Sequence, residues 1–95
     1  MDHPITHVLD SHKGAFVIDH DGTRLATMTY TLAGDDTIIL DHTDVDASLR
    51  GSGAGQALVA AAVAWARDSA RKIMPLCPFA RSVFDRTPEY ADIRS

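Results

Sequence analysis

Residues 56–72 constrain the fold of this chain most strongly, because they contain seven alanines and neither glycine nor proline. Alanine has the highest helix propensity of all residues, and Leu58 and Trp65 add large apolar side chains within the segment. Arg71 and Lys72 stand at its end, where basic side chains suit the negative pole of a helix dipole. The composition therefore predicts a helix of about four to five turns.

A glycine-rich loop leads directly into this predicted helix. Its sequence is Arg50, Gly51, Ser52, Gly53, Ala54 and Gly55. Small residues allow several backbone N–H groups to approach one anion, and the N-terminus of the helix adds a partial positive charge. The loop is therefore predicted to hold a diphosphate, although an ordinary tight turn between a strand and a helix would also use glycine here.

The first half of the chain shows the alternation of apolar and polar residues that is typical of strands. Three such stretches, separated by turn residues, are residues 5–9, 14–19 and 23–32, and a fourth, more apolar stretch follows at residues 37–45. The first three predict an antiparallel meander. Ile38, Ile39 and Leu40 make the fourth stretch apolar on both faces, so we expect a central strand there.

The second half predicts a strand–helix–strand unit. Residues 73–77 form a short apolar stretch after the helix, and residues 79–86 predict a second, short helix that ends before Pro88. A crossover of this length normally joins two parallel strands, and ligands of such units bind outside the carboxyl ends of the strands. We therefore expect His42, the glycine loop and Cys77 to converge at one end of the sheet.

Composition and charge exclude several classes of protein. With 95 residues, the chain suits a single domain over residues 1–95 and is too short for two independent cores. No segment approaches the roughly 18 apolar residues of a membrane span, and a net charge of −4 gives no broad basic surface for nucleic acid. Cys77 is the only cysteine, which fits a reducing compartment. We expect a soluble, cytoplasmic protein that binds neither nucleic acid nor membranes.

Spacing separates the glycine loop from two other phosphate-binding loops. The dinucleotide fingerprint requires glycine or alanine three residues after its second glycine, whereas Gln56 stands three residues after Gly53. A Walker A loop requires Gly-Lys followed by Ser or Thr, which this sequence lacks. Arg50, Gly53 and Gly55 instead match a pattern of Arg or Gln, two residues, Gly, one residue, and Gly or Ala. This pattern resembles the pyrophosphate-binding loop of the GNAT acetyltransferases.

Two further motifs narrow the resemblance. A His-Thr-x-Val stretch comprises His42, Thr43 and Val45, and a Pro-x-Cys-Pro-Phe stretch comprises Pro75, Cys77, Pro78 and Phe79. Both are similar to motifs of a minimal, single-domain branch of the GNAT family. The resemblance implies an α+β, shortened GNAT fold, in which an antiparallel meander is followed by a βαβ unit and a short C-terminal helix. Ser52 departs from this branch, which commonly has lysine at that position.

The resemblance implies an acyl-CoA-dependent N-acetyltransferase, with acetyl-CoA as co-substrate between two splayed parallel strands. It places the coenzyme against Thr43, Val45, Arg50, Gly51, Ser52, Gly53, Ala54 and Gly55. The acceptor would be a small-molecule or peptidyl amine, and neither its identity nor the oligomeric state follows from the sequence. A CoA-binding module without turnover and a structural or accessory domain remain alternatives, because the gap between Leu9 and Gly14 is too short for the helices that build an acceptor pocket in larger GNAT enzymes.

Cys77 and His42 are the candidate catalytic residues. A thiol is nucleophilic only as a thiolate, so Cys77 could accept the acetyl group while His42 takes its proton. Alternatively, an amine attacks acetyl-CoA directly and Cys77 only lines the slot as a small apolar side chain. On a regular strand His42 could face away from Cys77, and a bulge near residues 41–43 could turn it back. The other histidines have no cysteine or carboxylate at ligand spacing, so we expect no metal site.

Overall fold

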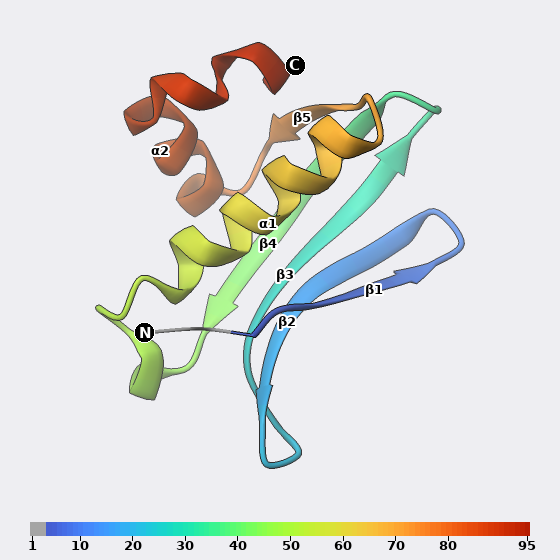
Figure 1. Ribbon diagram of the computed structural model, residues 1–95. Coiled ribbons are helices and arrows are strands. Elements are labelled where there is room, and N and C mark those ends of the chain that lie inside the picture. Colours follow the sequence, from blue (N-terminus) through green and yellow to red (C-terminus); the bar gives the residue numbers. More distant parts are fainter. Residues whose placement is uncertain (1–3) are drawn as a thin grey trace.

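Tight turns join the first four strands into an antiparallel meander. The computed structural model describes residues 4–95 (Figure 1). Its first four strands are β1 (Thr6–Asp10), β2 (Lys13–His20), β3 (Thr23–Ala33) and β4 (Thr37–Val45). The turns between them contain Ser11, Asp21, Gly22 and Gly34 with positive φ, a conformation that glycine and aspartate tolerate best. The predicted meander is confirmed.

The second half of the chain adds the helices and one parallel strand. In chain order these are the 3₁₀ helix η1 (Ala47–Leu49), α1 (Ala54–Asp68), β5 (Lys72–Pro75), α2 (Pro78–Arg86) and the 3₁₀ helix η2 (Pro88–Ile93). The strand order in the sheet is β1-β2-β3-β4-β5, and β5 runs parallel to β4. The predicted βαβ unit is therefore confirmed, with α1 as its crossover helix.

Helix α1 is shifted towards the N-terminus relative to the alanine-rich segment. It begins at Ala54 rather than residue 56 and ends at Asp68 rather than residue 72. Ala70 takes a left-handed conformation with φ of 57°, and the N–H of Arg71 then bonds back to the carbonyl of Ala66 at 2.8 Å. This is the usual way in which a helix ends when its last carbonyls are satisfied by the residues that follow. Lys72 is thereby released to begin β5.

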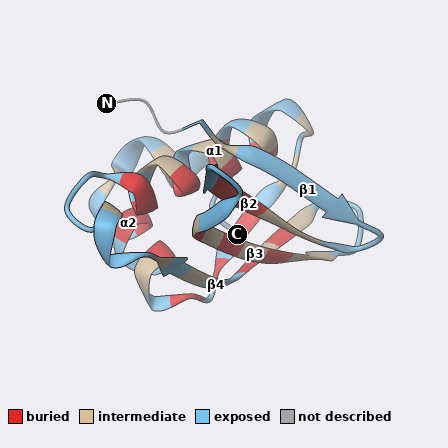
Figure 2. Cartoon of the chain, turned by 90° about the horizontal axis from the view of Figure 1, so that it is seen from below, coloured by how far each residue is buried: buried red, intermediate tan, exposed pale blue. Residues whose placement is uncertain are grey.

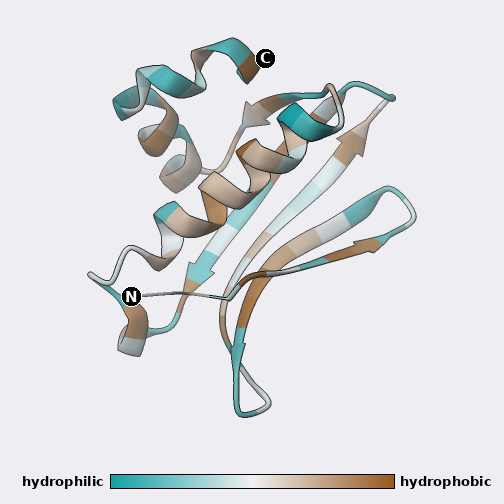
Figure 3. Ribbon diagram, viewed as in Figure 1, coloured by the Kyte–Doolittle hydropathy of each residue, from teal (hydrophilic) through white to brown (hydrophobic). Residues whose placement is uncertain are grey.

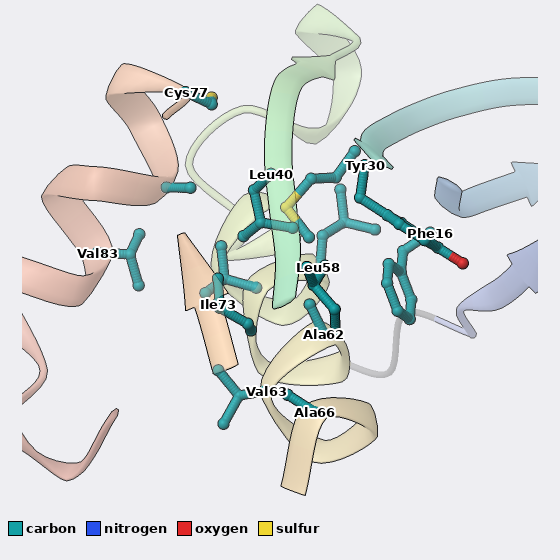
Figure 4. Close-up of a cluster of buried hydrophobic side chains, with 14 of the residues drawn as sticks. Phe16, Tyr30, Leu40, Leu58, Ala62, Val63, Ala66, Ile73, Cys77 and Val83 are labelled. Carbon is teal, nitrogen blue, oxygen red and sulfur yellow. The ribbon is translucent and has the colours of Figure 1, made fainter. Parts of the chain in front are cut away.

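The helices pack on one face of the sheet. Met28, Tyr30 and Leu40 point from the sheet into a core that also contains Leu58 of α1 and Phe84 of α2. Figure 2 shows the buried residues gathered between the sheet and the helices, and Figure 4 shows α1, α2 and the sheet contributing side chains to one cluster. The predicted α+β class is confirmed in this two-layer arrangement.

The other face of the sheet carries no helix among residues 4–95. Thr27, Thr29 and Thr31 of β3 alternate with buried core residues and lie half-exposed on this helix-free face. Figure 3 shows that the carboxyl end of β4 is hydrophilic, in contrast to the apolar strip along α1. Within the described chain, no helix is long and apolar enough to cross a membrane.

Strand β1 is held to the domain by an aromatic cluster. The ring of His7 stacks on Phe16 at 4.3 Å and meets the edge of Trp65 at 4.4 Å, and its Nε2 shares a hydrogen bond with the Tyr30 hydroxyl. A Cβ at Gly14 would lie 2.4 Å from that hydroxyl oxygen, so glycine leaves the space that the Tyr30 ring occupies. Every residue of β1 is exposed overall, and the ring contacts of His7 add to the backbone pairing of this edge strand with β2.

Candidate active site

Strands β4 and β5 separate at Leu40. The last pair of residues between them is Leu40 with Pro75, and the N–H groups of Leu76 and Cys77 both donate to the Leu40 carbonyl, at 3.2 and 3.0 Å. Beyond this point β4 continues along the sheet, whereas the chain after Cys77 turns into α2 (Figure 1). The two strands thus diverge on the carboxyl side of this pair, and we call the region between them the slot.

A β-bulge lies in β4 where the slot begins. Tyr30 of β3 pairs with Leu40, and the neighbouring Thr29 pairs with His42, so Asp41 is an extra residue in β4. Paired residues point to the same face of a sheet. His42 therefore lies on the helix-free face with Thr29, and its side chain is exposed.

The bulge brings Thr43, rather than His42, to Cys77. Thr43 pairs with the buried Met28 and points towards the helices, where the Cys77 thiol donates to its Oγ1 at 3.3 Å. The bulge expected near residues 41–43 is present, but it has the reverse of the expected effect, because it turns His42 away from the helix side. The structure thus does not bring the two candidate catalytic residues together, and the catalytic role of His42 remains a prediction.

The N-terminus of α1 offers free backbone N–H groups. Gly53 is the N-cap residue, and the first N–H bonded within the helix is that of Ala57, which donates to the Gly53 carbonyl at 2.9 Å. The N–H groups of Ala54, Gly55 and Gln56 precede it and have no acceptor within the helix. Because glycine has no side chain, the N-cap residue cannot satisfy them. This arrangement suits the binding of an anion such as a phosphate group.

Glycine stands at the three positions of the loop for different physical reasons. Gly51 and Gly53 have φ of 80° and 86°, and a Cβ there would meet nothing within 4 Å, so the backbone conformation requires glycine. Gly55 lies inside the helix, and a Cβ there would be 2.5 Å from Cζ of Phe79. Gly55 therefore leaves room for the Phe79 ring, which the sequence argument did not anticipate.

A cavity of about 550 Å³ connects the glycine loop with the slot. Seven of the eight residues predicted to bind the coenzyme line it, namely Thr43, Val45, Arg50, Gly51, Gly53, Ala54 and Gly55. Ser52 is the exception, and its hydroxyl donates to the Leu49 carbonyl at 2.5 Å. The glycine loop and the start of α1 line one end of the cavity and bring backbone N–H groups to it. Thr43 of β4, which carries a hydroxyl, lines the other end.

Sequence reasoning missed four residues of the cavity wall, which are Asp44, Leu49, Gln56 and Phe79. Phe79 belongs to the Pro-x-Cys-Pro-Phe motif but received no role, because only the tertiary fold places α2 against the start of α1. Gln56 could have been found, since it lies in the first turn of the predicted helix and its side chain is exposed.

Cys77 sits at the N-terminus of α2, deeply buried with 4% of its surface exposed. Burial alone would raise the pKa of the Cys77 thiol, but the Thr43 hydroxyl and the backbone N–H groups of Ala80, Phe79 and Thr43 outweigh it, so the pKa is lowered. The site can therefore stabilise a negative charge on sulfur.

Arg81 and Tyr90 do not line the cavity. Arg81 donates to the Leu76 carbonyl at 3.5 Å, and the Tyr90 ring packs 5.4 Å from that of Phe84. In the described part of the chain, no three His, Cys, Asp or Glu side chains are close enough to hold a metal ion.

Comparisons with known proteins point to one family. Residues 15–93 match a family model described as GCN5-related N-acetyl-transferase. A GCN5-like protein from Staphylococcus aureus, solved by NMR, is 32% identical with a TM-score of 0.73, and the match covers 95% of this chain and 87% of that chain. A search of curated proteins found no match.

Two larger acetyltransferases share the fold at lower identity. The ribosomal-protein-alanine N-acetyltransferase from Brucella melitensis biovar Abortus 2308 is 19% identical with a TM-score of 0.66, and the match covers 81% of this chain and 62% of that one. An aminoglycoside N-acetyltransferase in complex with CoA is 18% identical with a TM-score of 0.58, with coverage of 81% and 67%. Each match thus covers most of this chain but only about two thirds of the larger protein.

Proposed function

Because the chain belongs to the GCN5-related N-acetyltransferase family, we propose that it transfers an acetyl group from acetyl-CoA to an amine. The observation that carries this proposal is the course of the cavity. It begins at the free N–H groups of α1, which suit phosphates, and extends to Thr43, where β4 and β5 separate. Acyl-CoA combines a diphosphate with a distant thioester, so its two ends suit the two ends of the cavity.

We assign the diphosphate to the start of α1 and the thioester to the slot. The N–H groups of Ala54, Gly55 and Gln56 would bind phosphate oxygens, and Arg50 lines the same cavity. Thr43 and Val45 would line the path of the thioester end along β4. Ser52 was predicted to bind the coenzyme too, and we assign it an indirect role through its bond to the loop backbone.

The reaction we favour is direct transfer. The neutral nitrogen of the acceptor amine attacks the thioester carbonyl, a C–N bond forms, the C–S bond breaks, and the departing thiolate takes up a proton. His42 remains the candidate proton acceptor, and from the helix-free face it would serve the amine rather than Cys77. Direct transfer agrees with the position of Cys77, which is buried behind Thr43.

A specific observation favours a second route through acetyl-Cys77. The environment of the sulfur stabilises a thiolate, which could attack the thioester carbon, release CoA and later pass the acetyl group to an amine. Incubation with acetyl-CoA, followed by an acid quench and peptide mass spectrometry, would detect one acetyl group on Cys77. An acetyl-Cys77 species that disappears on addition of amine would establish this route, and full turnover in Cys77→Ser would exclude it.

Binding and turnover test the proposed function separately. Native mass spectrometry should detect one CoA per chain, and release of free CoA from acetyl-CoA in the presence of an amine should report transfer. Gln56→Glu should weaken CoA binding about fivefold or more, because it adds a negative charge beside the expected phosphates. The same change should leave the helix at least as stable, since acidic side chains favour helix N-termini.

Ala60→Glu is the matched control. It adds the same charge at an exposed position of α1 that does not line the cavity, so CoA affinity should stay near that of the unaltered chain. Equal weakening by both substitutions would mean that only net charge matters and would remove the assignment to the start of α1. Binding of CoA without transfer to any amine would instead indicate a binding module.

A further inference from the structure

Thr43 owes its orientation to the bulge in β4. On a regular strand, residues 38, 40 and 42 would share a face, and Thr43 would point to the opposite side. The extra residue Asp41 shifts this alternation, and the Thr31 hydroxyl donates to its carboxylate at 2.7 Å on the helix-free face. Thr43 therefore faces the helices, at the position along β4 where the partner strand has already turned away.

In that position Thr43 links the cavity to the thiol. Thr43 lines the cavity, and its Oγ1 lies 3.3 Å from the sulfur of Cys77, a residue that does not itself line the cavity. Threonine suits this position because branching at Cβ restricts rotation of its side chain. A hydroxyl can accept a hydrogen bond from a thiol and donate one to a thiolate, so the contact can persist in both protonation states.

Among residues 4–95, the groups that lower the pKa of the Cys77 thiol are uncharged. They are the Thr43 hydroxyl, with the N–H of Thr43, on β4 and the N–H groups of Phe79 and Ala80 at the start of α2. Arg81, the charged side chain nearest in sequence, donates to the Leu76 carbonyl instead. A buried sulfur with 4% exposure thus depends on fixed dipoles for any charge that it carries.

We propose that Thr43 is a positioning residue of the candidate active site: its hydroxyl holds the buried Cys77 sulfur behind the cavity wall and stabilises it as a thiolate. Its importance for catalysis rests on the proposed function. Its effect on the sulfur does not, and it can be measured without coenzyme or acceptor.

The test is a titration of the thiol in the full chain. Cys77 is the only cysteine, so the ultraviolet absorbance of thiolate, corrected with Cys77→Ser, reports this sulfur alone. Thr43→Val, which has nearly the same shape, should shift the titration to higher pH. At a fixed pH below the midpoint, it should lower the ratio of thiolate to thiol about tenfold. Thr43→Ser keeps the hydroxyl and should titrate close to the unaltered chain.

Thr29→Val is the control, because it removes a hydroxyl from the helix-free face of the neighbouring strand. Circular dichroism checks folding, and Thr43→Ala replaces the valine variant if that one does not fold. An unchanged titration in the folded variant without the hydroxyl would overturn the proposal, as would an equal shift in Thr29→Val. Native mass spectrometry with CoA on the same samples keeps the two proposals apart, since a shifted titration without CoA binding would leave Thr43 in place and remove the acetyltransferase assignment.

Discussion

At the scale of single residues, the glycine loop shows how one motif can serve several physical requirements. Gly51 and Gly53 supply left-handed backbone conformations that shape the loop, whereas Gly55 leaves space for an aromatic ring from another helix. A sequence pattern with three glycines does not distinguish these cases. They predict different responses to substitution.

Gly55→Ala should destabilise the protein by about 1–3 kcal/mol, because the new methyl group would overlap the Phe79 ring. In a Phe79→Ala background the same change should be neutral or stabilising by up to about 1 kcal/mol, since alanine is the better helix former. Denaturant unfolding of the four proteins in this cycle gives both values.

Gly53→Ala provides the comparison for this cycle. Its cost arises from positive φ, about 1–2 kcal/mol, and should not depend on residue 79. If Gly55→Ala were equally costly with and without the Phe79 ring, contact with that ring would not be the reason for glycine at position 55.

At the scale of elements, the His7 side chain adds ring contacts to the backbone pairing that joins β1 to β2. The His7 ring stacks on Phe16, meets the edge of Trp65 and shares a hydrogen bond with the Tyr30 hydroxyl, although the residue is exposed overall like the rest of the strand. Partial burial lowers the pKa of His7. Protonation is therefore less favourable in the folded state than in the unfolded chain.

This asymmetry predicts a pH dependence of stability. As pH falls through about 6.5, the unfolded chain takes up a proton that folded His7 resists, so the free energy of unfolding should decrease. The urea midpoint measured at about pH 7.5 and about pH 5.5 should drop more in the unaltered protein than in His7→Gln. His12→Gln removes an exposed histidine of the neighbouring turn and should preserve the larger drop. Equal drops in the unaltered protein and in His7→Gln would contradict the role given to His7.

At the scale of the whole molecule, the helices cover one face of the sheet and the C-terminal residues cover its β5 edge. On the β5 side, Ile73 forms a bridge with Arg94 and accepts a hydrogen bond from the N–H of Ser95 at 2.7 Å, so the C-terminal residues cover that edge. The Arg67–Asp92 ion pair, at 2.8 Å, holds the same segment against α1. Strands β4 and β5 separate at their carboxyl ends, and the cavity lies beside this end of β4.

Much of this architecture follows from local sequence. Alternation over the first three stretches, the apolar fourth stretch, the alanine-rich helix and the short apolar strand after it predict the order of elements, because each pattern is typical of one kind of element. The crossover rule then makes β4 and β5 parallel and places the glycine loop beside their carboxyl ends. Seven of the eight residues predicted to bind coenzyme line one cavity for this reason.

Only the tertiary structure decided which side chains meet there. The bulge at Asp41 depends on how β3 and β4 pair, so the alternation within β4 could not reveal that Thr43 faces Cys77 and His42 does not. The contact of Phe79 with Gly55 likewise joins two helices that are separate in sequence. Local sequence determined the elements of this protein, whereas contacts between those elements determined the chemistry available at the slot, because orientation across a sheet depends on register between strands.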